Sequence, residues 1–167
     1  MKDVIKPKGS AAFGTRLRRL SERLDRQIEM LYRANGVDFQ PRWYPVITAL
    51  IDESEASVGE LASMIGITHA AVSQVRGELI RAGLIRVKTD PADRRRQLLA
   101  LSAKGRRYAE TLTPLWRAIA AATDDLLAEV APDLLRDLAE LEAALDAEPM
   151  IDRIARKAKR GKHAFVD

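Results

Sequence analysis

Apolar residues recur every three or four positions over much of this chain, which is the period of amphipathic helices. In the first such stretch six large apolar residues lie on one face and arginines on the other. Pro41 and Pro45 fall at the start of the second, where proline disturbs a helix least. Pro114 falls inside a later one and predicts a kink or a break there. These predicted helices cover residues 10–34, 42–52, 102–130 and 132–147.

The middle of the chain predicts two short helices separated by a tight turn. Residues 58–65 have apolar positions at helical spacing, and Gly66 then ends the helix. Thr68 is a good N-cap for a second helix over residues 69–82, which Gly83 ends. Two helices joined by a glycine-containing turn of about three residues form a helix-turn-helix.

A β-hairpin is predicted directly after the second of these helices. The strand-like runs, residues 84–88 and 97–101, flank a loop that contains three consecutive arginines. The hairpin therefore has a basic tip, the wing of a winged helix-turn-helix. The predicted fold is mainly α, with one β-hairpin wing and N- and C-terminal helices that form a dimerisation region.

Charge is distributed unevenly along the 167 residues, whose formal net charge is only +4. Residues 58–108 carry ten Arg and Lys against four Asp and Glu, whereas residues 109–149 carry two against ten. The first 34 residues carry nine against four. This uneven distribution indicates that the basic middle of the chain binds a polyanionic partner, and that the acidic segment lies away from that partner.

Several classes of protein are disfavoured by what the sequence lacks. Without cysteine there are no disulfides, thiolate metal sites or thiol-based redox sensors in this chain. No apolar run approaches the roughly 20 residues that span a bilayer, and no apolar signal-peptide region is found near Met1, so we expect a cytoplasmic protein without membrane contact. No glycine-rich phosphate loop is present, and neither histidine has carboxylates at metal-ligand or catalytic-triad spacing. We therefore expect no catalytic site, no metal site, no cofactor and no enzyme activity.

The second helix of the helix-turn-helix has side chains suited to reading DNA bases. A helix fits the major groove of B-DNA, and its N-terminal residues reach base edges. Gln can bond adenine bidentately, Ser and Thr can bond bases or phosphates, and Ala can touch a thymine methyl. Arg76, one turn further on, suits a phosphate. The alternative is that these small polar residues only solvate an exposed face. The candidate DNA contacts are Thr68, His69, Ala70, Ser73, Gln74 and Arg76.

The wing loop adds three guanidinium groups, from Arg94, Arg95 and Arg96. Arginine gains from the enhanced negative potential of a narrow minor groove. Because side chains alternate along a strand, one or two of them should face DNA while another pairs with Asp90 or Asp93 to hold the loop rigid. The alternative is a solvated charged turn.

At these residues the chain resembles the MarR family of bacterial winged-helix transcriptional regulators, over residues from about 10 to 148. The similarity is strongest from Val58 to Gly105, and the wing segment from Asp90 to Arg95 (DPADRR) is its most diagnostic element. The resemblance implies a structural pair between Asp93 and Arg95 and a position near the minor groove for Arg94. The family often has an acidic residue just after the leucine that corresponds to Leu79, where this chain has Ile80, which puts a local ion pair in doubt.

The resemblance also implies dimers that bind pseudo-palindromic operators, generally repress, and often release DNA when a small phenolic molecule binds. Apolar stripes in the terminal helices predict a homodimer independently, because little else in the chain can cover them; the alternative is an intramolecular three-helix cluster. A two-fold dimer would set its recognition helices about 34 Å apart. The aromatic ligand pocket is a weaker prediction, since such residues also serve as plain core. Its candidate residues are Phe39, Trp43, Tyr44, His69, Tyr108 and Trp116.

We thus expect a regulator that binds double-stranded DNA, and the resemblance implies that it is a repressor. The competing hypothesis is a winged-helix module that binds proteins and not DNA. The basic tail after Pro149 suits either an extra phosphate-binding arm or a solvated helix end. The expected organisation is a flexible segment (1–9), a dimerisation helix (10–36), the DNA-binding domain (37–101), linking and dimerisation helices (102–148) and the tail (149–167).

Overall fold

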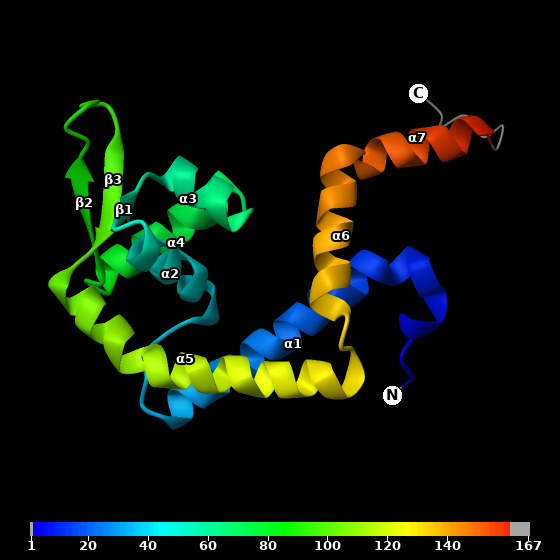
Figure 1. The fold of residues 1–167 in the computed structure, drawn as a ribbon, viewed down its shortest axis with the longest axis horizontal. Coiled ribbons are helices and arrows are strands. Elements are labelled where there is room, and N and C mark those ends of the chain that lie inside the picture. Colours follow the sequence, from blue (N-terminus) through cyan, green and yellow to red (C-terminus); the bar gives the residue numbers. More distant parts are fainter. Residues whose placement is uncertain (1, 161–167) are drawn as a thin grey trace. The chain divides into compact units, whose positions relative to one another are not determined.

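The computed structural model describes residues 2–160, with only the backbone at the last two. Figure 1 shows the elements in chain order. The two 3₁₀ helices are η1 (Lys6–Ala12) and η2 (Pro41–Trp43). The strands are β1 (Glu55–Ala56), β2 (Ile85–Thr89) and β3 (Gln97–Leu101). The α-helices are α1 (Phe13–Ala34), α2 (Tyr44–Asp52), α3 (Val58–Ile65), α4 (His69–Arg81), α5 (Ala103–Val130), α6 (Leu134–Ala147) and α7 (Met150–Arg160). The chain divides into two compact units between Thr111 and Leu112, inside α5.

Asp3 links the first described residues to one another and to α1. A carboxylate oxygen of Asp3 accepts hydrogen bonds from the backbone N–H groups of Ile5 at 2.9 Å and Lys6 at 3.1 Å. Arg19 on α1 donates to the other oxygen at 3.0 Å. These bonds hold the pKa of Asp3 well below its usual range. The start of the chain is therefore tied to α1 by a pair that sequence spacing does not reveal.

The predicted helix-turn-helix is present, as α3 and α4. A capping box starts α3, in which Ser57 Oγ accepts from the Glu60 N–H at 3.3 Å and the Glu60 carboxylate accepts from the Ser57 N–H at 2.8 Å. Gly66 ends α3 in the left-handed conformation, with φ of 73°. The hydroxyl of Thr68 caps α4 by accepting from the Ala71 N–H at 3.2 Å.

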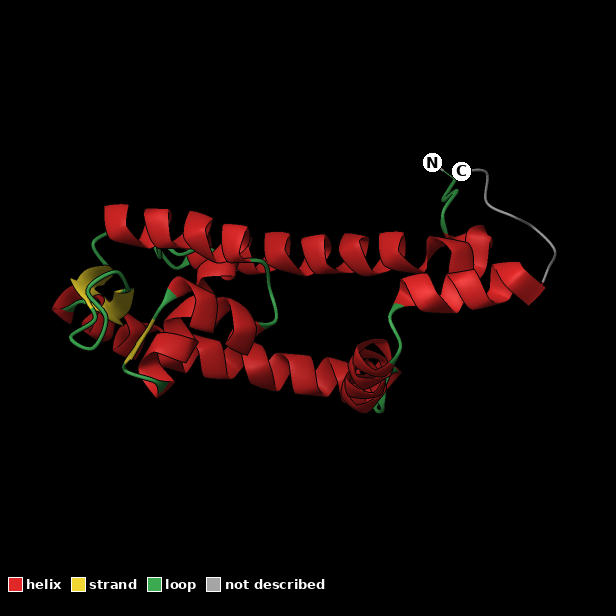
Figure 2. Cartoon of the chain, turned by 90° about the horizontal axis from the view of Figure 1, so that it is seen from above, coloured by secondary structure: helices red, strands yellow, loops and turns green. Residues whose placement is uncertain are grey.

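The sheet has three antiparallel strands in the order β1-β3-β2. The β2–β3 hairpin is the predicted wing, with Val87 opposite Leu99 and Thr89 opposite Gln97. Figure 1 shows this hairpin extending beyond the helices beside it, and Figure 2 shows the strands gathered in one small region. Strand β1 was not predicted, because its two residues are too few to show the alternating pattern of a strand.

Most of the buried core belongs to the wing, the helix-turn-helix and α2. The side chains of Val46, Leu61, Val72, Leu79 and Leu99 are all completely buried. They come from α2, α3, α4 and β3, so the apolar face of each element is turned inward. The face of α4 opposite this core remains available to solvent.

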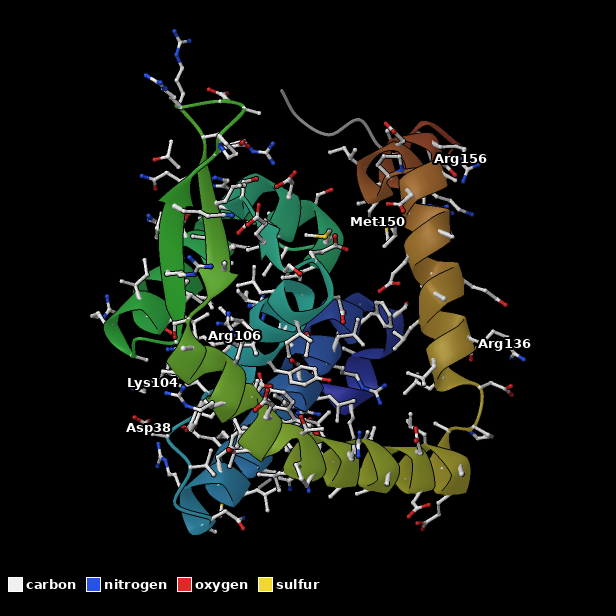
Figure 3. All side chains as sticks on the ribbon, turned by 60° about the vertical axis from the view of Figure 1, so that its left-hand side comes forward. Asp38, Lys104, Arg106, Arg136, Met150 and Arg156 are labelled. Carbon is white, nitrogen blue, oxygen red and sulfur yellow. The ribbon has the colours of Figure 1, made fainter. Side chains whose placement is uncertain are left out.

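Helix α5 begins at a close backbone crossing. Ser102 caps it, accepting from the Gly105 N–H at 2.9 Å while its hydroxyl donates to the Gly83 carbonyl at 2.7 Å. A Cβ at position 105 would overlap the backbone oxygen of Leu84, so only glycine fits. Lys104 and Arg106, labelled in Figure 3, lie in this first turn, and the ammonium of Lys104 donates to the Ala82 carbonyl at 2.7 Å.

Residues 112–160 are helical throughout, apart from short connections. A kink or a break was predicted at Pro114. Helix α5 continues through this proline, so there is no break. At the α6–α7 corner, the Arg153 guanidinium donates to the carbonyls of Ala144 at 2.6 Å and Glu148 at 2.9 Å. Arg156, labelled in Figure 3, pairs with the Glu148 carboxylate at 3.0 Å. The basic continuation after Pro149 is thus helical as far as residue 160, and residues 161–167 of the expected tail lie outside the described residues.

Candidate nucleic-acid interface

The N-terminal half of α4 presents small polar side chains to solvent. Thr68, His69, Ala70 and Gln74 are exposed and Ser73 is half-buried, with its hydroxyl 3.5 Å from His69 Nδ1. On the other side of the helix Val72, Val75 and Leu79 are buried. Apolar packing therefore fixes which face of α4 a DNA groove would meet. We call α4 the recognition helix from here on.

Arg76 connects the recognition helix to the wing. Its guanidinium donates to the Gln97 side-chain oxygen at 2.9 Å, at the first residue of β3. Its Nε is buried and has no hydrogen-bond partner. Arg76 was predicted to reach a phosphate; in the free chain this guanidinium is held against the wing.

Both aspartates of the wing loop bond backbone N–H groups. Asp90 is buried, and its carboxylate accepts from the Ala92 N–H at 2.8 Å. The Asp93 carboxylate accepts from the Arg95 N–H at 2.9 Å. Local side-chain acceptors of this kind specify turns, and here they shape the loop that carries Arg94 and Arg95, both exposed.

The wing arginines divide differently from the expectation that Arg95 pairs with Asp93. No ion pair joins those two side chains, both of which lie within the described residues. Arg96 instead pairs with Glu60 at the start of α3 and with Asp90, whose carboxylate is 3.6 Å from the guanidinium. Arg96, like Arg76, therefore has structural contacts within the interface. Glu60 and Ser57 are also part of the site, although they were not predicted.

The ion pair between Arg96 and Glu60 shifts the pKa values of both groups. The Arg96 guanidinium, with the N–H and hydroxyl of Ser57, lowers the pKa of Glu60 to about 2, and Glu60 in turn raises the pKa of Arg96. Both groups are therefore charged at neutral pH. The Ser-x-x-Glu spacing of a capping box could have identified Ser57 and Glu60, but no sequence signal connects them to Arg96, which is 36 residues beyond Glu60.

A second unpredicted carboxylate, Glu78, lies on the recognition helix. Arg42 donates to both of its oxygens, at 2.9 and 3.0 Å, and the indole N–H of Trp43 donates at 2.6 Å. Hydrogen bonds from Arg42 lower the pKa of Glu78, against the effect of burial. The chain has no acidic residue at position 80, just after Leu79, but it does have an ion pair here. Glu78, just before Leu79, forms that pair with Arg42.

Three of the six predicted ligand-pocket residues come together in an aromatic cluster. The ring centroids of Phe39 and Trp43 are 5.6 Å apart, and those of Phe39 and Tyr108 6.3 Å apart. Burial, reinforced by Asp38, raises the pKa of Tyr108, whose hydroxyl donates to the Asp38 carbonyl at 3.0 Å. Tyr44 is about half exposed and His69 lies exposed on α4, whereas Trp116 belongs to the unit that starts at Leu112.

This arrangement of a capped, exposed recognition helix beside a basic wing defines a winged helix-turn-helix of the DNA-binding class. The family model that matches the chain is that of the MarR family, over residues 37–96. The match covers the helix-turn-helix and most of the wing, and members of the MarR family are transcription regulators and not enzymes. Among proteins of curated function, none matches the sequence.

Solved structures of the same fold resemble most of the chain. The transcriptional regulator MosR of M. tuberculosis in complex with DNA is 25% identical, with a TM-score of 0.66 over 81% of this chain and 97% of that one. A probable transcriptional regulator from Pseudomonas aeruginosa is 27% identical, with a TM-score of 0.60 over 79% and 95%. BpsR of Bordetella bronchiseptica, whose DNA binding is regulated by 6-hydroxynicotinic acid, is 25% identical, with a TM-score of 0.59 over 80% and 98%.

Two further observations concern the described residues as a whole. None of their helices combines the length and the apolarity that a membrane crossing requires. Within the same residues, no group of three or more His, Asp or Glu side chains is placed to hold a metal ion.

Proposed function

We propose that this chain is a homodimeric repressor of transcription that binds a pseudo-palindromic DNA operator and is released from it by a small aromatic effector. One observation carries the DNA-binding part. The exposed polar end of the recognition helix and the exposed arginines of the wing belong to the same compact unit and are joined by the bond between Arg76 and Gln97.

The roles of individual side chains follow from their exposure. Gln74 and its exposed neighbours at the start of α4 would meet base edges in the major groove. Arg94 and Arg95 would meet the sugar-phosphate backbone or the minor groove. Arg96, engaged with Glu60 and Asp90, would act indirectly by fixing the wing. The MosR complex with DNA supports this use of the fold.

The homodimer is supported by apolar residues that the chain leaves exposed. On α1, Phe13, Leu17, Leu20 and Leu24 are between 43% and 51% exposed. A groove of about 630 Å³ lies along α1 and η1, lined by three of these residues and by the basic side chains of Lys6, Arg16, Arg19 and Arg23. Residues 109–149, with ten acidic and two basic residues, complement that lining in charge. A second copy of the chain therefore suits the groove both in polarity and in charge.

The effector part is supported by the aromatic cluster of Phe39, Trp43 and Tyr108 and by the regulation of BpsR by 6-hydroxynicotinic acid. Trp43 also bonds Glu78 on the recognition helix, so a molecule that disturbed the cluster would disturb that helix. Adding 6-hydroxynicotinic acid or another hydroxylated aromatic acid to the DNA complex should release DNA and change the fluorescence of Trp43.

The test of DNA binding is a titration of purified protein into labelled DNA from upstream of its own gene, followed by fluorescence anisotropy at several salt concentrations. Affinity should exceed that for shuffled DNA and fall steeply with salt, because phosphate contacts release counterions. The variant Arg94→Ala should weaken binding to all sequences and reduce the salt slope by about 1. Arg18→Ala, which removes the same charge from α1, is the matched control and should change neither.

Two results would count against the proposal. Unchanged affinity and salt slope in Arg94→Ala would remove the wing from the interface. A wild-type protein without preference for its upstream DNA at any salt concentration would overturn the regulator and leave a winged-helix module that binds proteins.

A further inference from the structure

The Glu78 carboxylate on the recognition helix is largely buried and accepts hydrogen bonds from two residues of η2. Its side chain is only 13% exposed, although the residue lies one turn after the exposed Gln74 on the recognition helix. Arg42 and Trp43 supply three hydrogen bonds of 2.6 to 3.0 Å to its two oxygens. A two-pronged arginine–carboxylate pair fixes geometry as well as charge, so Glu78 fastens the recognition helix to η2.

Removing a charge from water is costly unless hydrogen bonds satisfy it. At Glu78 that condition is met from one side by η2, whose Arg42 and Trp43 are adjacent in the chain. Trp43 is itself buried and packs edge-to-face on Phe39. Packing thus holds the Trp43 partner of Glu78 in place, and the carboxylate can orient side chains next to it on the helix.

The side chain next to it is Gln74, whose amide nitrogen lies 3.5 Å from Glu78 Oε1. Glutamine has a donor end and an acceptor end, and an ionised carboxylate accepts only. The Glu78 carboxylate therefore favours the orientation in which the NH₂ group of Gln74 faces it and the carbonyl faces away. This choice decides whether the amide meets a base with its donor or its acceptor foremost, and adenine requires both ends in one orientation.

We propose that Glu78 is a positioning residue that sets the base preference of Gln74, by fixing the recognition helix on η2 and by dictating the orientation of the Gln74 amide. The inference rests on the proposed DNA-binding function. It goes beyond that function in assigning specificity to a residue that touches no base.

The experiment compares Glu78→Gln with wild type on a library of operators varied at each position. A glutamine side chain can both donate and accept, so the Gln74 amide loses its single favoured orientation. At one position per half-site, we expect the ratio of affinities between the preferred base and the others to fall about tenfold. The ¹H–¹⁵N signal of the Trp43 indole, identified with a Trp116→Phe variant, should shift as its carboxylate acceptor is lost.

Three further variants make the result specific. In a Gln74→Ala background, Glu78→Gln should no longer change base preference, because the residue through which it acts is gone. Arg42→Lys, which keeps the charge, should retain most of the preference. Glu60→Gln, which removes the carboxylate that pairs with Arg96, should weaken all sequences alike and leave the indole signal unmoved.

The positioning role is overturned if folded Glu78→Gln keeps the wild-type preference, or if it changes preference equally in the Gln74→Ala background. Should Glu78→Gln not fold, Glu78→Asp keeps the charge but withdraws the carboxylate from the Gln74 amide, and an unchanged preference in that variant also overturns the role. If the wild type itself prefers no sequence, the proposed function fails, which is a different result from a preferring wild type that Glu78→Gln leaves unaltered.

Discussion

The middle of this chain covers its own apolar residues, whereas its two ends do not. Apart from Ala12, every buried apolar residue lies between Tyr32 and Leu112, and the described residues after Leu112 contribute none. On α1 and α6, by contrast, large side chains such as Leu20 and Leu135 are more than half exposed. We call residues 32–111 the reading unit. Since burial of apolar area drives folding, the reading unit can be stable on its own core, and the terminal helices need another surface.

The contrast extends to polar contacts. In the reading unit, Arg42–Glu78 and Arg96–Glu60 join elements distant in sequence. In α6, the guanidinium of Arg136, labelled in Figure 3, pairs only with residues of its own helix and the helix cap within the described part of the chain. Local pairs of this kind contribute little to a tertiary arrangement. The ion pairs of Arg136 therefore do little to hold α6 against another element.

The largest effect should come from Leu20→Asp, which places a charge on the exposed apolar face of α1. The reading unit should stay folded, because Leu20 is outside its core, but association should fail and operator affinity should fall more than about hundredfold, since two linked reading sites become independent. Sedimentation equilibrium and anisotropy measure the two quantities. Thr15→Asp adds the same charge on the opposite face of α1 and should leave both unchanged. If the Leu20→Asp variant still forms a dimer, the exposed apolar face of α1 is not the surface through which two copies associate.

A stability loss of about 3 kcal/mol is expected from Gly105→Ala. The added methyl would overlap the Leu84 carbonyl, so α5 must move away from the wing. Urea denaturation measures the loss. The matched control is Gly77→Ala in the recognition helix, where the methyl has room and should stabilise by up to about 1 kcal/mol. Equal stability of the two variants would mean that the crossing at Leu84 can relax.

The smallest effect concerns pH and Glu60. Its pKa is lowered in the folded chain from an ordinary 4.5 to about 2, so the pair with Arg96 stabilises fully above the ordinary value and is lost as pH falls through the folded value. The difference in Tm between wild type and Glu60→Gln should therefore be constant near neutral pH and shrink between about pH 5 and pH 2. Asp3 and Glu78 are shared by both proteins and cancel. A difference independent of pH would show that the pair does not contribute.

Much of the reading unit could be predicted because its determinants are local. Helical periodicity, Gly66 and the Thr68 cap placed α3 and α4, and the arginine-containing loop between two apolar runs placed the wing. Pairing was predicted only in part. The residues left Asp90 or Asp93 as the partner of one wing arginine, and Arg96 does pair with Asp90. The Asp93–Arg95 pair that the resemblance implied is not formed, and Arg96 also pairs with Glu60, a residue that only folding brings near. Strand β1 was missed since two residues have no period of their own.

The sequence by itself therefore determined where the helices, the turn and the wing lie, because backbone preference and apolar spacing act over a few residues. Only the tertiary structure decided which charges work together. It placed Arg96 on the capping box of α3, and it placed Glu78 between Arg42 and Gln74. Such contacts depend on the packing of whole elements against a common core, and no short-range pattern encodes the distance between them.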